Sequence, residues 1–143
     1  MLKRPDRVEM LRTVPLFAVC KKRELQRIEK AIEIVEYEAD ETVVKEGDQG
    51  DAFYVIFEGR AIVVRNGRTI AKLKEGNHFG ELALLSPAPR NASVVTTKPS
   101  KLGVLRGKDF DKVLLDVPTV MPRLLTALAV RAREAGMADT TSG

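Results

Sequence analysis

The stretch FGELALLSPAPRNASV, residues 79–94, is the part of the sequence from which the rest can be interpreted. Gly80 has no Cβ atom, so a ligand can approach the backbone there, and the following residues can begin a short helix whose free N–H groups attract an anion. Pro87 and Pro89 end that helix and restrict the backbone before Arg90. A guanidinium presented in this way can bind two phosphate oxygens together. The stretch therefore predicts a pocket for a small phosphate ester.

Glu81 requires a separate explanation, because a carboxylate beside a phosphate is repelled by the charge of the ligand. It fits such a pocket if it accepts hydrogen bonds from a neutral group, such as a ribose hydroxyl. Phosphate, ribose and an apolar wall together indicate a nucleotide. Two alternatives stay open for Glu81, which are an acid favoured at a helix N-terminus and an ion-pair partner of Arg90. A lone arginine after a proline is most often a solvated loop charge.

These residues resemble the phosphate-binding cassette of cyclic nucleotide-binding domains, whose usual form is F-G-E-L/I-A-L followed, after a short loop, by P-R-x-A-x-V. The resemblance covers roughly residues 10 to 135. It implies that the ligand-binding positions are Gly80, Glu81, Leu82, Ala83, Arg90 and Asn91. To these we add Ala92, which matches the alanine of the pattern, and Ser93, whose hydroxyl could face the base. Alternation along a strand makes an outward polar position for Ser93 equally acceptable.

Asn91 departs from the family pattern and bears on the choice of base. Members selective for cyclic AMP often have a small residue here, whereas a threonine is associated with cyclic GMP. Asparagine can donate to a phosphate oxygen or to a base edge. We expect cyclic AMP as the ligand, with cyclic GMP second. The resemblance implies a regulatory sensor that transmits occupancy through its terminal helices, and Leu124 and Leu128 are candidates for an apolar lid over the base.

Length and composition indicate one folded domain. The chain has 143 residues, of which 44% are hydrophobic and 31% charged, as in ordinary soluble globular proteins. No apolar run approaches the ~20 residues of a membrane-spanning helix, and the first ten residues lack the apolar core of a signal peptide. We therefore expect a cytoplasmic protein with no membrane partner.

The net charge of +4 is unevenly distributed. Residues 1–30 contain nine Lys and Arg against four acidic residues, whereas residues 31–60 contain two against nine. The basic residues alternate with apolar ones at helical spacing, which is typical of a solvated helix face, and no DNA-reading motif accompanies them. We expect no nucleic-acid partner for this chain.

The sequence does not provide the usual residues of a metal centre or of a nucleophilic enzyme. His78 is the single histidine and Cys20 the single cysteine, so neither an all-His/Cys zinc site nor an internal disulfide can form. A cupin-type metal centre would need two or three imidazoles. We expect no metal, no catalytic cofactor and no enzymatic activity, although a lone carboxylate or lysine mechanism stays open. His78 is expected in a loop and Cys20 in a partly buried position on a helix.

Apolar residues recur at helical spacing on both sides of the cassette. A helical turn is predicted at residues 6–12 and a helix at residues 20–32, and the later helical region is broken at Pro118 and stops at Gly136. The predicted organisation is a helical segment at residues 1–32, a β roll with the cassette at residues 33–106, two C-terminal helices at residues 107–137 and a frayed tail at residues 138–143.

The region between the helices reads as strands. Seven or eight short runs rich in β-branched and aromatic residues are separated by glycine turns, and Asn66-Gly67 is a strong hairpin signal. The prediction is a mainly β fold, an eight-stranded antiparallel, jelly-roll-like β roll with flanking helices.

Two further functional classes are left open by the residues. One is an interaction domain that keeps the cassette but does not respond to nucleotide, and the other is an enzyme that hydrolyses the cyclic phosphate, for which the usual metal ligands are lacking. In the family the domain is joined to a kinase, a channel, an acyltransferase or a winged helix-turn-helix, none of which fits after residue 137. We expect a stand-alone sensor, with an intact start suggested by Met1, or a fragment of a longer protein. An unidentified protein partner and a homodimer through the terminal helices are further expectations.

Overall fold

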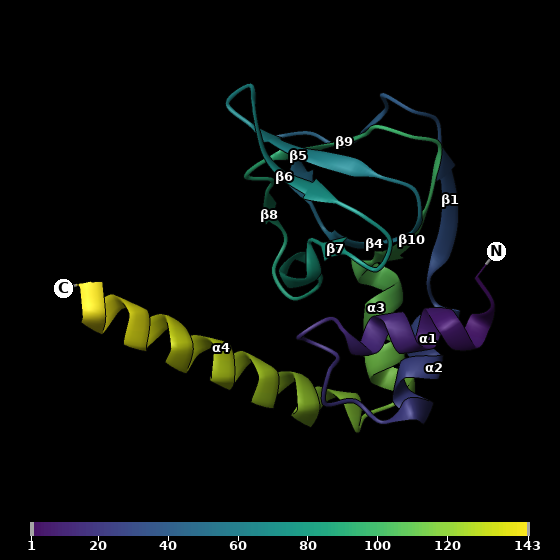
Figure 1. Cartoon of the computed structure of the whole chain (residues 1–143). Coiled ribbons are helices and arrows are strands. Elements are labelled where there is room, and N and C mark those ends of the chain that lie inside the picture. Colours follow the sequence, from purple (N-terminus) through teal and green to yellow (C-terminus); the bar gives the residue numbers. More distant parts are fainter. Residues whose placement is uncertain (1, 143) are drawn as a thin grey trace.

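The structure is a computed structural model that describes the backbone of residues 2–142 and the side chains of residues 2–136. Helices begin and end the described chain, and short strands lie between them (Figure 1). The helices are α1 (Arg4–Arg12), α2 (Lys22–Lys30), α3 (Gly107–Asp116) and α4 (Val120–Ser142), with one 3₁₀ turn, η1 (Glu81–Leu84). The strands are β1 (Glu33–Tyr37), β2 (Thr42–Val44), β3 (Gln49–Gly50), β4 (Ala52–Glu58), β5 (Ala61–Arg65), β6 (Arg68–Leu73), β7 (His78–Phe79), β8 (Ala88–Pro89), β9 (Ser93–Thr96) and β10 (Ser100–Arg106).

The strands form a roll of two antiparallel sheets. One sheet has the order β1-β10-β4-β7 and the other the order β2-β9-β5-β6. Their eight strands confirm the predicted eight-stranded antiparallel roll with helices on both sides in sequence. The additional pair of β3 with β8 was not predicted, because two-residue strands are too short to show a periodic pattern.

Strand β4 separates two hydrophobic cores. Phe53, Val55 and Phe57 lie in the core shared with the helices, whereas Tyr54 and Ile56 face the interior of the roll. This division follows from the alternation of side chains across a strand. Because both faces are covered, the strand reads as a continuous apolar run in the sequence.

The helices pack against one side of the roll and fill the first core (Figure 1). Leu25 and Ile28 of α2, within the helix predicted at residues 20–32, are fully buried. Cys20 lies just before α2 rather than within it, and it is fully rather than partly buried. Its burial, reinforced by the nearby carboxylate of Glu24, raises the pKa of the Cys20 thiol to about 11.

Helix α4 continues past the stop that the sequence predicted. It passes through Gly136 and extends to Ser142, leading away from the rest of the structure (Figure 1). Gly136 does not adopt the left-handed conformation of a C-terminal cap, and a single glycine in an exposed helix costs only about 1 kcal/mol. The sequence also predicted a frayed tail at residues 138–143. Residue 143 and the side chains of residues 138–142 lie outside the described part of the structure.

Candidate functional site

The cassette turns sharply between β7 and η1. Gly80 lies at this turn with a φ of 82°, a left-handed conformation that favours glycine, and it directly precedes the 3₁₀ turn. A hollow of about 280 Å³ opens beside the turn. Its lining includes six of the eight predicted site residues, namely Gly80, Glu81, Leu82, Ala83, Arg90 and Asn91, together with Ser86, Ala88 and Pro89. The two halves of the cassette therefore meet around one space.

The guanidinium of Arg90 is held by backbone and by an aromatic ring. Its Nη2 atom donates a hydrogen bond of 2.8 Å to the carbonyl oxygen of Ala52, and its Cζ atom lies 5.7 Å from the ring centroid of Tyr54. A Cβ atom added at Gly50 would overlap Arg90 Nε, and one added at Gly80 would lie 2.5 Å from Nη1. The arginine thus occupies space that two glycines leave free.

Among the described side chains, none provides a counter-ion for Arg90. In residues 2–136 no carboxylate lies within ion-pair distance of this half-buried side chain. Arg90 also borders a second hollow of about 260 Å³, on the side of Tyr54 and Gly50. A guanidinium has five N–H donors, so most of its hydrogen-bonding capacity is available to an anion in either space.

The backbone at Arg90 is anchored by the segment before β4. Pro89 belongs to β8, which pairs with Gln49 in β3. The N–H of Arg90 donates to the carbonyl of Asp48, and its carbonyl accepts from the N–H of Gly47, both over 2.8 Å. Sequence reasoning attributed the rigidity of this position to prolines, and the strand pairing supplies a second cause.

Glu81 lies between the side chains of Arg131 and His78. Arg131 Nη1 on α4 donates to its Oε1 over 3.1 Å, and His78 Nδ1 lies 3.6 Å from its Oε2, which is an ion-pair distance when the ring is protonated. The contact with His78 is the largest influence on this carboxyl group. Together with a hydrogen bond from the backbone N–H of Glu81 and the contact with Arg131, it outweighs burial and lowers the pKa of Glu81 to about 2. His78 itself lies in β7 rather than in the predicted loop, because its backbone pairs with Val55.

Four other predicted residues have different surroundings. Ala92 is buried, and Ser93 Oγ accepts a hydrogen bond of 2.9 Å from the N–H of Glu46 instead of being free. Neither residue lines the hollow beside η1. Leu124, a lid candidate, is fully buried in the helical core, and Leu128 packs against that core. In this arrangement Leu124 is not available to cover a ligand.

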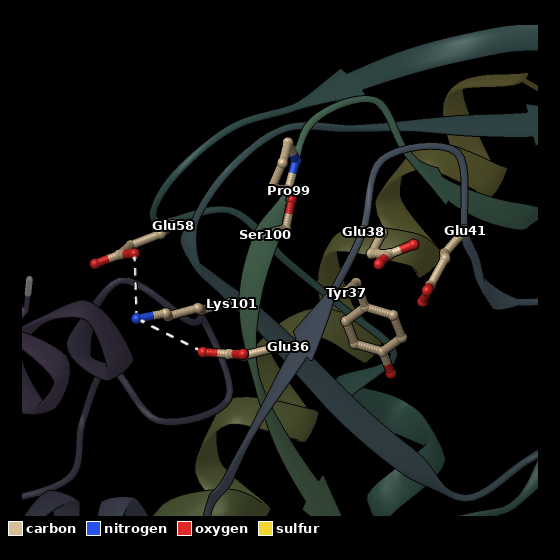
Figure 2. A pocket seen from close by; sticks show the side chains of 8 residues that line it. All are labelled: Glu36, Tyr37, Glu38, Glu41, Glu58, Pro99, Ser100 and Lys101. Atoms are coloured by element: carbon tan, nitrogen blue, oxygen red, sulfur yellow. Dashed lines mark ion pairs between the residues drawn. The ribbon is translucent and has the colours of Figure 1, made fainter.

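A second region of the surface is hollowed but has a different character. It is a space of about 670 Å³ whose lining contains none of the predicted site residues. Figure 2 shows the side chains that line it. Lys101 Nζ lies there 3.8 Å from Glu36 Oε1 and 4.0 Å from Glu58 Oε2. Glu38 and Glu41 lie on the opposite side of this space (Figure 2). An excess of carboxylates repels a phosphate, so this space is not suited to a nucleotide.

Sequence reasoning missed the groups that complete the site from a distance. These are Gly50, the carbonyl of Ala52, and Arg131. The closely spaced glycines before β4 were a signal for a close backbone approach at Gly50. No local signal linked Arg131 to Glu81.

The described residues contain no group of three or more His, Cys, Asp or Glu side chains arranged to hold a metal ion. Of the helices whose residues are described, none is long and apolar enough to cross a membrane.

Comparison with known proteins places the chain in a family. Residues 34–116 match the family described as the cyclic nucleotide-binding domain, a family of non-catalytic regulatory modules. The cAMP-dependent protein kinase regulatory subunit of Aspergillus niger is 38% identical over 115 residues, which cover 79% of this chain and 28% of that protein. The chain thus spans less than a third of this curated relative.

Two solved structures have the same fold. The N-terminal domain of a transcriptional regulator from Streptomyces coelicolor A3(2) has a TM-score of 0.85 and 32% identity, covering 90% of this chain and 93% of that one. The catabolite activator protein of Thermus thermophilus has a TM-score of 0.70 and 30% identity, covering 90% of this chain and 63% of that one. The cassette, the roll and the matched residues agree, and the chain belongs to the cyclic nucleotide-binding domain family.

Proposed function

We propose that the chain is a sensor that binds a cyclic nucleotide, cyclic AMP in preference to cyclic GMP, at Arg90. The observation that carries the proposal is a half-buried guanidinium with no carboxylate partner among the described residues, held between Gly50 and Gly80 beside an open space. An unpaired cation in such a position gains strongly from an anion that can accept two hydrogen bonds. The cyclic phosphate is such an anion.

The remaining cassette residues fit complementary roles. Glu81 is ionised at neutral pH because its pKa is about 2, so it can only accept hydrogen bonds, as a ribose hydroxyl requires. Ala83 is small, and the first N–H groups of η1 lack acceptors within a 3₁₀ turn, so the phosphate can approach the backbone there. The preference for cyclic AMP is supported by the relatives, which are named as cAMP-dependent.

The pair of Glu81 and Arg131 provides a route from the site to α4. A ribose hydroxyl at Glu81 competes with Arg131 or changes the geometry of their contact, so occupancy alters the free energy of holding α4 in place. In this proposal α4 is the output of the sensor. The chain spans less than a third of the curated relatives. In this proposal the effector that receives the signal is an unidentified protein in the cytoplasm.

Titration calorimetry with cyclic AMP and cyclic GMP tests the proposal. Arg90→Ala should weaken cyclic AMP binding by several kcal/mol, roughly 3, because the buried phosphate loses its charged partner. Arg60→Ala is the control, since this exposed arginine has no side-chain hydrogen bond or ion pair among the described residues. Equal affinities of the wild type and Arg90→Ala, or no binding of either nucleotide, would overturn the proposal and favour an interaction domain that does not respond to nucleotide. Release of AMP during incubation would instead indicate a hydrolase.

A homodimer through the terminal helices is a further part of the proposal. Leu115 on α3 and Met121 and Leu125 on α4 are exposed, with Leu115 81% and Leu125 59% accessible. Exposed apolar residues on the two consecutive helices favour a second apolar surface as cover. Sedimentation should show a dimer for the wild type and a smaller species for Leu125→Glu.

A further inference from the structure

We infer that the tip of the β5–β6 hairpin, residues 65–68, positions Arg90 by holding the backbone on both sides of it. The inference rests on the proposed function, since it gives these residues a part in presenting the arginine that binds the ligand. None of them lines the hollow beside η1, so they act through the cassette backbone rather than by contact with a ligand.

The first link is the segment that carries the backbone of Arg90. Gly47 donates to the carbonyl of Arg90 and Asp48 accepts from its N–H, each over 2.8 Å. Two bonds to adjacent residues define the position and the direction of the peptide units at Arg90. Any movement of residues 46–48 is therefore passed to the arginine.

The second link joins that segment to the hairpin tip. Glu46 Oε1 accepts a hydrogen bond of 3.1 Å from the N–H of Asn66. The N–H of Glu46 donates a hydrogen bond of 2.9 Å to Ser93 Oγ. Glu46 is thereby fixed between the hairpin and the start of β9. The cassette is thus supported at residues 46–48 by a part of the chain that is 20 residues away in sequence.

The third link reaches the cassette from the other side of Arg90. Arg65 Nε donates a hydrogen bond of 3.0 Å to the carbonyl of Asn91, the residue that follows the arginine. The support is rigid, because Asn66 and Gly67 have φ values of 52° and 77°, as in the tight two-residue turns that match the twist of a hairpin. Strand β5 also pairs with β9, which begins at Ser93 within the last residues of the cassette.

The hairpin offers a matched control for these contacts. Arg65 and Arg68 face each other in the hairpin register and are both exposed, but among the described residues the side chain of Arg68 makes no hydrogen bond or ion pair. Arg65→Ala and Arg68→Ala remove the same charge from the same place. Only Arg65→Ala removes a support of the cassette.

Amide hydrogen exchange of the full chain without ligand tests the inference separately from nucleotide binding. Arg65→Ala should increase the exchange rates of the Gly47 and Arg90 amides about fivefold, and Arg68→Ala should leave them unchanged, with similar melting temperatures for both variants. Rates in Arg65→Ala equal to those in Arg68→Ala would overturn the inference, whatever the chain binds. If the wild type binds neither cyclic nucleotide, the proposed function fails while this comparison still decides the positioning role.

A second comparison uses the proposed ligand and the acceptor at Glu46. Glu46→Ala should increase the dissociation rate of a fluorescent cyclic AMP analogue about fivefold, whereas Glu46→Gln, which keeps an oxygen acceptor for Asn66, should restore the wild-type rate. A loss of charge alone would affect both variants alike. Equal dissociation rates for Glu46→Ala and the wild type would contradict the positioning role of the hairpin tip.

Discussion

Arg131 of α4 donates a hydrogen bond of 3.1 Å to Glu81 of the cassette, although the two residues are 50 positions apart in sequence. Between its start and this contact, α4 is fixed to the core by Val120 and Leu124. Residues 132–136 beyond Arg131 are exposed. The ion pair therefore joins α4 to the cassette beyond its buried first turns, and it involves a residue of the proposed ligand pocket.

Replacement of Arg131 by glutamine should loosen α4 with little effect on overall stability. The pair is partly exposed on the arginine side, and such pairs contribute about 0 to 1 kcal/mol. Amide exchange in the last described turns of α4 should become faster while the melting temperature changes little. Arg133→Gln is the control, because Arg133 is exposed and its side chain has no hydrogen bond or ion pair among the described residues. Equal exchange in the two variants would argue against a restraining role for Arg131.

The stability of the folded chain should depend on Glu81 at neutral pH and lose that dependence in acid. The contact with His78, and to a lesser degree the backbone N–H of Glu81 and the contact with Arg131, lower the pKa of Glu81 from its usual 4.5 to about 2. A carboxyl with a lowered folded-state pKa stabilises the fold above its unfolded pKa, and this contribution disappears as the pH falls from about 4.5 to about 2. Glu81→Gln should therefore be less stable than the wild type by about 1 to 3 kcal/mol at pH 7.

Urea unfolding at several pH values between 7 and about 2.5 measures this difference, with Glu75→Gln as a control for an exposed glutamate. The gap between the wild type and Glu81→Gln should narrow as the pH falls, and the gap for Glu75→Gln should stay near zero. A gap for Glu81→Gln that is the same at all pH values would show that the lowered pKa does not contribute to stability.

Substitution of Gly50 by alanine should impair binding more than folding. The added Cβ would overlap Arg90 Nε, so the flexible arginine side chain must leave its place over Tyr54, whereas the backbone of Gly50 is not left-handed and tolerates alanine. We expect a loss of nucleotide affinity of about tenfold or more, by analogy with the loss of one charged hydrogen bond. Gly136→Ala, where a Cβ would meet nothing within 4 Å, is the control. Wild-type affinity for Gly50→Ala would show that the orientation of Arg90 over Tyr54 is not required.

The sequence was sufficient for features that depend on local patterns. Apolar spacing located the helices, and turn residues located the hairpin at Asn66 and Gly67. The short spacing from Gly80 to Arg90 indicated that the two halves of the cassette line one space. Features that depend on tertiary contacts could not be predicted. The direction of α4 places Arg131 beside Glu81, and it depends on how the first turn of the helix packs. Apolar spacing defines which face of a helix is buried but not the direction in which the helix runs.

Tertiary burial also distinguishes two further ion pairs, both formed by residues of α2. Glu24 is only 2% exposed, and its Oε1 accepts from Arg123 Nε on α4 over 2.7 Å. Arg27 Nη2 contacts Asp116 Oδ2 on α3 at 2.6 Å, but both side chains are exposed, at 39% and 58%. The shorter contact is thus the more hydrated one, and burial rather than distance should determine the energetic effect.

Arg123→Ala should therefore destabilise the chain by about 3 kcal/mol, because it leaves a buried carboxylate without its cation, whereas Arg27→Ala should cost less than about 1 kcal/mol. Urea unfolding of the two variants gives the comparison directly. Adding Glu24→Gln to Arg123→Ala should recover part of the loss, since a neutral amide is less costly to bury than an unpaired charge. Equal losses of stability in the two arginine variants would show that the buried pair of Glu24 and Arg123 does not hold the first turns of α4 in place. Another contact would then have to position Arg131 beside Glu81.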